Sequence, residues 1–187
     1  MEVLIGLVLL FSVLVALIPA YMTFFSNNIK RIDSFIEAHK HQPMWTLHYA
    51  MATHDYKKIG PALHKMKSTG KEFENIAITY LQTERRELRL AKASAATISS
   101  RNIRNYHQAL IALLEEDENR FQAHLKQVRY KGQRYALLAN FSYKKGDYAE
   151  ADRFGKLAIL HSRGLKKWTL VKSKQYQESN ASRELYF

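Results

Sequence analysis

Residues 135–159 of this chain read YALLANFSYKKGDYAEADRFGKLAI. Apolar residues recur with the 3.6-residue period of a helix, over about residues 133–145 and again over about residues 148–161. Gly146 stands between the two runs, and glycine commonly ends a helix and starts a turn. The stretch therefore predicts a helical hairpin, in which two antiparallel helices are joined by a tight turn.

The hairpin sequence resembles a tetratricopeptide repeat, which is a helix–turn–helix unit of about 34 residues. The resemblance assigns the large, small and turn positions of that repeat to Tyr135, Leu138, Ala139, Gly146, Ala151 and Ala158. Small residues at a helix crossing allow close approach, and large residues fill the spaces opposite them. The chain departs from the repeat at Ser142 and Gly155, which replace aromatic residues, and at Arg163, which replaces a proline.

Helical periodicity extends over the rest of the chain after Arg31, without strand-like alternation. Weaker versions of the hairpin pattern cover residues 49–66 and 106–128, and breaks fall near residues 41, 54, 69, 101, 117, 131, 146 and 164. Residues 71–100 are predicted to form one longer helix, because their second half is rich in helix-forming residues. The expected fold is all-α, a short solenoid of stacked antiparallel hairpins, with an irregular helical bundle as the alternative.

The N-terminal residues predict a transmembrane helix. Residues 3–25, VLIGLVLLFSVLVALIPAYMTFF, lie in an uncharged stretch between Glu2 and Lys30. A helix of this length spans about 34 Å, enough for a hydrocarbon core of about 30 Å. A cleaved signal peptide, the alternative, needs a basic start and a small-x-small cleavage site, and the chain has neither. Residues 1–29 are therefore predicted to be a transmembrane anchor.

The charges beside this segment predict its orientation. Lys30 and Arg31 follow it, whereas Glu2 precedes it. Because Lys and Arg are retained on the cytoplasmic side, we expect a single-pass protein of the cell membrane with its N-terminus outside. Residues 30–177 are then a cytoplasmic repeat-like domain, and residues 178–187 a flexible tail. The compact size favours a bacterial membrane over the outer membrane of an organelle.

The composition excludes several kinds of chemistry. The chain has no cysteine, which excludes disulfides, thiolate metal sites and a cysteine nucleophile. It has no glycine-rich phosphate loop and no GxSxG motif. Its eight histidines lack the spacing of a helical metal site. We therefore expect a protein that is not an enzyme, with no catalytic residues, metal or cofactor.

Basic residues are the most informative polar feature, and the formal net charge is +12. Arg85, Arg89 and Lys92 share one helix face at positions i, i+4 and i+7. Such a group is either a solvated helix face, a contact with anionic lipid, or a docking surface for an acidic protein. Nucleic acid is not expected as a partner, because no stacking platform or recognition motif accompanies the charge.

A second basic group surrounds Trp168 and includes Lys166 and Lys167. If the domain folds back towards the bilayer, Trp168 can lie at the headgroups while the lysines meet anionic lipid. In the alternative, Trp168 caps the apolar end of the last hairpin. The residues predicted to lie at the membrane surface are Lys30, Arg31, Lys166, Lys167 and Trp168.

These features predict a membrane-anchored adaptor that docks a protein or peptide at the cytoplasmic face of the bilayer. In tetratricopeptide proteins the first helix of each hairpin commonly lines the concave docking face, so the resemblance implies roles for Tyr143 and Lys144. The predicted partner-binding residues are Tyr143, Lys144, Arg85, Arg89 and Lys92. The alternative function is an accessory subunit that acts through its transmembrane helix inside a larger membrane complex.

Overall fold

The computed structural model describes residues 17–66, 70–180 and 183–187, and all regular structure within these ranges is helical. Residues 17–24 are helical. They are followed by α2 (Ile29–His39), α3 (Pro43–Ala52), α4 (Tyr56–Lys65), α5 (Lys71–Glu84), α6 (Leu88–Ala96), α7 (Arg101–Leu114), α8 (Glu118–Leu125), α9 (Lys131–Lys144), α10 (Tyr148–Leu160) and α11 (Gly164–Ser179). The all-α prediction is confirmed for these residues.

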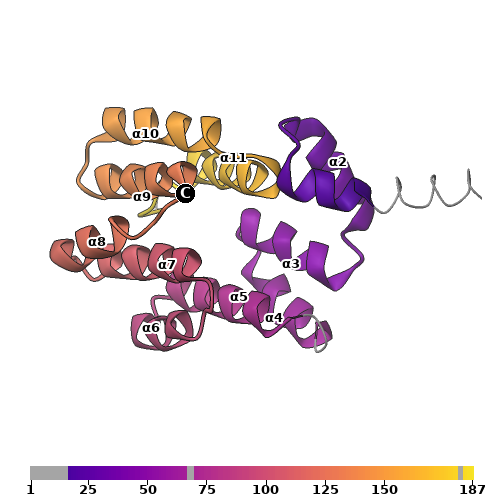
Figure 1. Ribbon diagram of the computed structural model, residues 1–187, viewed down its shortest axis with the longest axis horizontal. Helices are drawn as coiled ribbons and strands as arrows, with labels where there is room; N and C mark the ends of the chain where they lie inside the picture. The colour runs from indigo at the N-terminus through magenta and orange to yellow at the C-terminus, as the bar shows by residue number, and fades with distance from the viewer. Residues whose placement is uncertain (1–16, 67–69, 181–182) are drawn as a thin grey trace, which may run out of the picture.

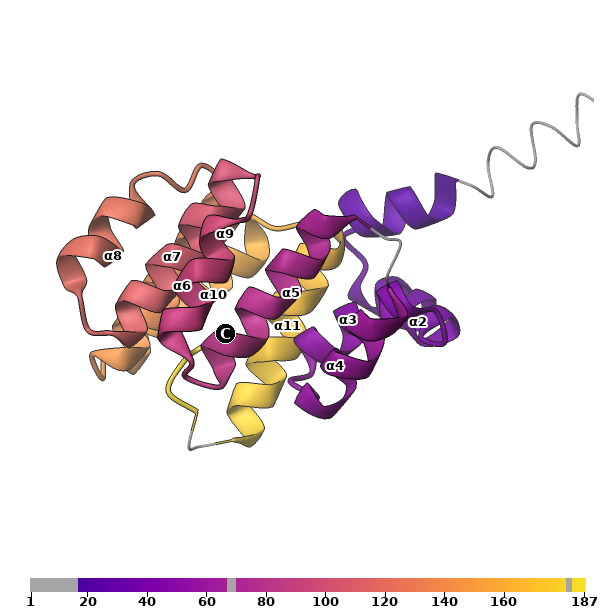
Figure 2. The same cartoon turned by 90° about the horizontal axis from the view of Figure 1, so that it is seen from below.

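Neighbouring helices pack as antiparallel pairs, namely α3 with α4, α5 with α6, α7 with α8, and α9 with α10. The pairs follow one another in a curved row (Figure 1). Helix α11 packs against α10 at one end of the row and against α2 and α3 at the other. In Figure 2 it accordingly runs through the middle of the molecule. Packing in neighbouring pairs is compatible with a helical repeat.

The four hairpin turns share one backbone feature. A residue with positive φ follows the first helix of each pair, namely His54 (54°), Arg86 (62°), Glu116 (62°) and Gly146 (81°). The next residue then donates its N–H to a carbonyl of that helix, as in the 2.9 Å bond from Asp147 to Ser142. This geometry satisfies carbonyls that the helix end would otherwise leave unpaired. The four positions recur at nearly even intervals along the sequence.

The turn at Arg86 corrects the prediction of one long helix over residues 71–100. The chain forms two helices there, α5 and α6, which pack against each other as a hairpin. Arginine has no preference for positive φ, since only glycine adopts it without steric cost. The local sequence therefore carries no turn signal, and the packing of the two helices decides the conformation.

The helix predicted at the N-terminus is corrected as well. The helical residues 17–24 end in a turn, and α2 begins as a separate helix after Asn28, whose side chain accepts a hydrogen bond from the Arg31 N–H at 3.1 Å. No helix among the described residues has the length and apolar character needed to cross a bilayer. Residues 1–16 of the predicted anchor lie outside the described ranges. The transmembrane fold class and the single-pass membrane localisation are therefore not supported, and neither is the premise of the accessory-subunit alternative.

Small residues meet where α9 crosses α10. Ala139, Ala151 and Ala158 have no exposed surface and belong to one apolar cluster. This matches the crossing positions that the resemblance assigns to them. Because α9 and α10 approach closely there, a larger side chain has no space to occupy.

Ala151→Leu is expected to lower the free energy of unfolding by about 1–3 kcal/mol through overpacking. Urea unfolding followed by circular dichroism measures the change. Ala149→Leu is the matched control, because Ala149 lies on the exposed face of the same helix. Equal stability of the two variants would contradict the tight crossing.

Candidate functional site

The last residues of the sequence lie inside the row of hairpins. We call Arg183–Phe187 the inner segment, and its residues Leu185, Tyr186 and Phe187 are only 4%, 4% and 7% exposed. In both Figure 1 and Figure 2 the end of the chain, marked C, falls within the outline of the helices. This differs from the flexible tail predicted for residues 178–187. The reason is that an apolar triplet in a polar context finds its apolar partners on helices far away in the sequence.

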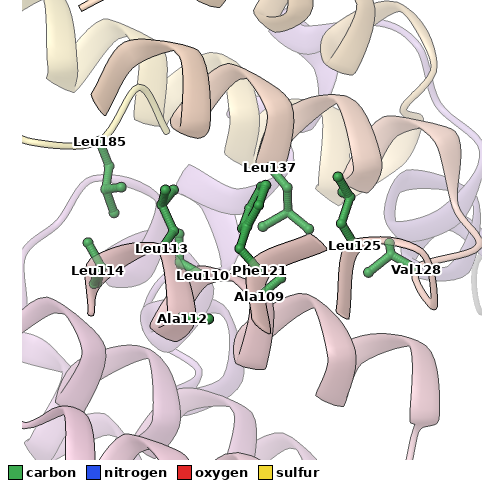
Figure 3. Close-up of a cluster of buried hydrophobic side chains, with 10 residues drawn as sticks. All are labelled: Ala109, Leu110, Ala112, Leu113, Leu114, Phe121, Leu125, Val128, Leu137 and Leu185. Atoms are coloured by element: carbon green, nitrogen blue, oxygen red, sulfur yellow. The ribbon is translucent and has the colours of Figure 1, made fainter. Parts of the chain in front are cut away.

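The side chain of Leu185 enters the largest apolar cluster of the molecule. This cluster lies between α7, α8 and α9, and Figure 3 shows Leu185 reaching it beside Leu113 and Leu114. Its centre is the fully buried Phe121, whose ring stacks on that of Phe141 at 5.0 Å. Leu185 therefore closes an apolar surface that the hairpins leave open on this side.

Tyr186 occupies a slot on α10. A side-chain carbon placed on Gly155 would lie 2.3 Å from the Tyr186 ring, so glycine is the residue that leaves room for it. The Tyr186 hydroxyl donates to Asp152 Oδ1 at 2.9 Å, and Lys174 Nζ donates to the same oxygen at 2.7 Å. Hydrogen bonds from Lys156, Lys174 and Tyr186 hold the pKa of the Asp152 carboxyl well below its usual range.

Asn140 of α9 holds the backbone of the inner segment. The Phe187 N–H donates to Asn140 Oδ1 at 2.9 Å, and Asn140 is 1% exposed. Its other polar atom, Nδ2, has no hydrogen-bond partner among the described residues. Buried amide donors are normally paired, so this donor is an unused binding group next to the inner segment.

These contacts define a single surface. We call the surface formed by Leu113, Asn140, Tyr143, Asp152 and Gly155 the inner groove. It is built from α7, α9 and α10, and α11 closes it through Lys174. A hollow of about 320 Å³, which also contains Leu113, continues towards Phe141, Lys144 and the α7–α8 turn. The groove thus holds a short non-helical segment, and it shares Leu113 with the neighbouring hollow.

The polar end of the inner segment reaches α5. Glu184 forms an ion pair with Arg86 in the α5–α6 turn. Arg183 lies 3.7 Å from Glu84 Oε1 and its guanidinium lies over the Tyr176 ring at 5.7 Å. The segment therefore spans the row from the second hairpin to the fourth.

Glu84 belongs to a buried polar cluster around His54. Its Oε2 accepts a hydrogen bond from the Tyr56 hydroxyl at 2.7 Å. His54 Nδ1 lies 2.7 Å from the Tyr80 hydroxyl, and Nε2 lies 2.8 Å from Ser173 Oγ. Burial lowers the pKa of His54. For Glu84, burial raises the pKa, but the contacts with His54 and Tyr56 and the charge of Arg183 outweigh it and leave the pKa below its usual value.

The order of Ser173, His54 and Glu84 resembles a nucleophile–base–acid series, but the contact between the base and the acid is long. His54 Nδ1 is 3.8 Å from Glu84 Oε2 and bonds to Tyr80 instead. Ser173 is 6% exposed, and its hydroxyl faces His54. The cluster joins α5, α11 and the α3–α4 turn to one another. Within the described ranges no three histidine or acidic side chains gather closely enough to hold a metal ion.

The predicted partner-binding residues fall in different places. Tyr143 lies in the inner groove, where its ring packs edge-on against Tyr186 at 6.0 Å. Lys144 lies on the rim and pairs with Glu116 at 3.2 Å, and Lys92 pairs with Glu115 at 2.6 Å. The two remaining residues are exposed and do not reach the groove, namely Arg85 and Arg89. The structure therefore brings Tyr143 and Lys144 together. The predicted common helix face of Arg85, Arg89 and Lys92 is wrong, because Arg85 ends α5 whereas Arg89 and Lys92 lie on α6, after the turn at Arg86.

The predicted membrane-surface residues need a correction at Trp168. This side chain has no exposed surface and packs among Ile32, Ile36 and other residues of α2 and α3. Its Nε1 donates to Asp33 Oδ1 at 3.0 Å. Trp168 is thus a core residue because α11 returns to the start of the row, and it is not available to lipid.

The basic residues of that group remain at or near the surface. Lys166 lies over the Tyr130 ring at 4.4 Å, and Lys167 is half-buried. Lys30 and Arg31 are exposed on α2. Because Trp168 is buried, it is not available as the aromatic membrane contact that was predicted beside these four basic residues.

Sequence reasoning missed Asn140, Asp152, Gly155 and the inner segment. One signal was present, because Gly155 stands where the tetratricopeptide pattern has an aromatic residue. The Tyr186 ring fills the space of that missing side chain. Asn140 and Asp152 carried no such signal, since polar residues on a helix are usually solvated.

No family model, no curated protein and no solved structure matches this chain.

Proposed function

We propose that this chain is a non-enzymatic adaptor of tetratricopeptide-like architecture that docks a partner protein through a short non-helical segment in the inner groove. The observation that carries the proposal is the way the groove holds Arg183–Phe187. Asn140 bonds to the backbone of that segment, and the slot at Gly155 takes an aromatic side chain. Peptide recognition uses these two kinds of contact, one for the backbone and one for side chains.

The repeated turn supports the tetratricopeptide-like part of the proposal. Its positions at His54, Arg86, Glu116 and Gly146 recur at nearly even intervals. These intervals are only slightly shorter than the period of about 34 residues that defines the repeat. Stacked hairpins of this kind present a concave surface built from their first helices. Asn140 and Tyr143 both lie on the first helix of the α9–α10 pair.

The test is a selection of displayed peptides with the full chain. The target carries Tyr186→Ser and Phe187→Ser, which leave the slot at Gly155 and the Asn140 side chain free. Selected peptides are then measured against the same chain with Gly155→Leu added, because a leucine fills the slot. We expect a set of related peptides whose affinity falls at least about tenfold in the filled groove, which corresponds to about 1.4 kcal/mol of binding free energy.

The matched control is Gly60→Leu on α4, where a side-chain carbon meets nothing within 4 Å. This substitution should leave peptide affinity unchanged. If no peptides are enriched, or if their binding ignores the filled slot, the docking function is wrong.

A further inference from the structure

Each position of the inner segment has a separate counterpart, in the inner groove or on the neighbouring α5 and α5–α6 turn. Arg86 meets the acidic Glu184, and Glu84 meets the basic Arg183. Leu185 enters the apolar cluster of α7 and α8. The aromatic positions that follow use the Gly155 slot and the cluster of small residues between α9 and α10.

The Tyr186 position also provides a hydrogen-bond partner for a hydroxyl group. Its ring is covered by the Gly155 backbone and by Tyr143, while its hydroxyl donates to Asp152 Oδ1, the oxygen that also accepts from Lys174. A phenylalanine at this position would lack the hydrogen bond to Asp152, which would keep Lys156 and Lys174 as partners. Tyrosine therefore fits this position better than phenylalanine.

Two buried polar groups at the inner segment lack a hydrogen-bond partner among the described residues. Asn140 Nδ2 is buried with no hydrogen-bond partner among the described residues, and Arg183 Nη2 of the segment makes no hydrogen bond there beyond its 3.7 Å ion-pair contact with Glu84 Oε1. Leaving such groups unpaired costs free energy. A segment from another protein whose backbone carbonyl accepts from Asn140 Nδ2 would make one bond more than the inner segment makes. This favours exchange of one segment for another.

From these observations we propose that the partner docks through a segment of the order basic–acidic–aliphatic–tyrosine–aromatic, and that Arg183–Phe187 is an internal competitor for the same groove. This inference rests on the proposed docking function and specifies its ligand. The free chain is then self-occluded, and a partner binds by displacing Tyr186 and Phe187 from their sites. The apparent affinity for a partner equals the affinity of the open groove multiplied by the fraction of molecules whose groove is open.

The first experiment measures binding of a labelled peptide, acetyl-Arg-Glu-Leu-Tyr-Phe, by fluorescence anisotropy. The proteins are the unsubstituted full chain and the variant Tyr186→Ser with Phe187→Ser. We expect the variant to bind at least about tenfold more tightly, because its groove is not occupied. Adding Gly155→Leu should abolish the gain, and a peptide with the same five residues in another order should bind weakly to all forms. Circular dichroism checks that each variant is folded.

A second measurement needs no change to the groove. A 4-fluorophenylalanine at position 187 of the otherwise unsubstituted chain reports by fluorine resonance whether this ring is buried. Excess peptide should move the signal from its buried position to that of a solvated ring. A signal that does not move while the peptide is in excess would show that the inner segment is a permanent part of the core, and the competitor role would then be wrong.

The binding results distinguish an error in the proposed ligand from an error in the docking function. If the variant binds peptides from the display selection but not Arg-Glu-Leu-Tyr-Phe, the proposed ligand chemistry is wrong and the docking function stands. If the folded variant binds no peptide of either kind, both are wrong. Equal affinity of the unsubstituted chain and the variant would contradict self-occlusion.

Discussion

Trp168→Ala is expected to lower the free energy of unfolding by about 3–5 kcal/mol, the usual cost of removing a large aromatic side chain from a core. Trp168 has no exposed surface and packs with Ile32, Ile36 and Leu165. The substitution also leaves Asp33 without the hydrogen bond from the indole nitrogen. Because Trp168 packs α11 against α2, its loss should weaken the contact between these two helices. Urea unfolding followed by circular dichroism measures the effect.

Two controls separate the cavity from other effects. Trp168→Phe keeps an aromatic ring in the core but removes the bond to Asp33, so it should cost less than the alanine variant. Leu160→Ala removes an apolar side chain that is 70% exposed and should change stability by less than about 0.5 kcal/mol. If Trp168→Ala proves as mild as Leu160→Ala, Trp168 does not belong to the core.

Acid is expected to destabilise the fold between about pH 6.5 and pH 4, because buried histidines must take up protons. Burial lowers the pKa of His107 to about 4 from its ordinary 6.5. The side chain is 7% exposed, and its Nδ1 has no hydrogen-bond partner among the described residues. Burial also lowers the pKa of His48 to about 4 and shifts that of His54 downward.

Acid destabilises the fold because the unfolded chain binds protons that the folded chain does not. Below pH 6.5 the unfolded chain protonates these histidines while the folded chain does not, so each histidine favours unfolding as the pH falls towards its folded pKa. Above pH 6.5 both states are neutral and the full stability is present. A shift from 6.5 to about 4 corresponds to a loss of about 3 kcal/mol for His107 alone at pH 4 and below.

The measurement is urea unfolding at several pH values between 7.5 and 4, for the unsubstituted chain and for His107→Gln. Glutamine does not titrate, so the variant should lose less stability than the unsubstituted chain over this range. The comparison at pH 7.5 isolates any loss of packing caused by the substitution itself. Identical slopes for the two proteins would show that His107 is not the buried, neutral group described.

The sequence by itself was enough to predict the hairpin of α9 and α10. Its helical periodicity, the turn at Gly146 and the small residues Ala139 and Ala151 are local signals, since they act within a helix or across one turn. The same reasoning missed the turn at Arg86, because arginine carries no turn signal. Only the packing of α5 on α6 holds that residue at positive φ.

At the candidate site, the sequence predicted Tyr143 through its place on the first helix of a hairpin. The inner segment could not be predicted in the same way. Phe187 and Asn140 are 47 residues apart, and Tyr186 and Asp152 are 34 residues apart. Contacts between residues so far apart in the sequence depend on how the whole row of helices packs. The periodicity of the sequence does not encode this packing.

Trp168 illustrates the same limit. Its sequence context, an aromatic residue among lysines, suits a membrane surface as well as it suits a core. The tertiary structure decides between them, because α11 packs on α2 and α3, and Trp168 bonds to Asp33 from 135 residues away. The elements of this protein therefore follow from local physics, whereas the burial of Trp168 and the occupation of the inner groove follow from the closure of the row by α11.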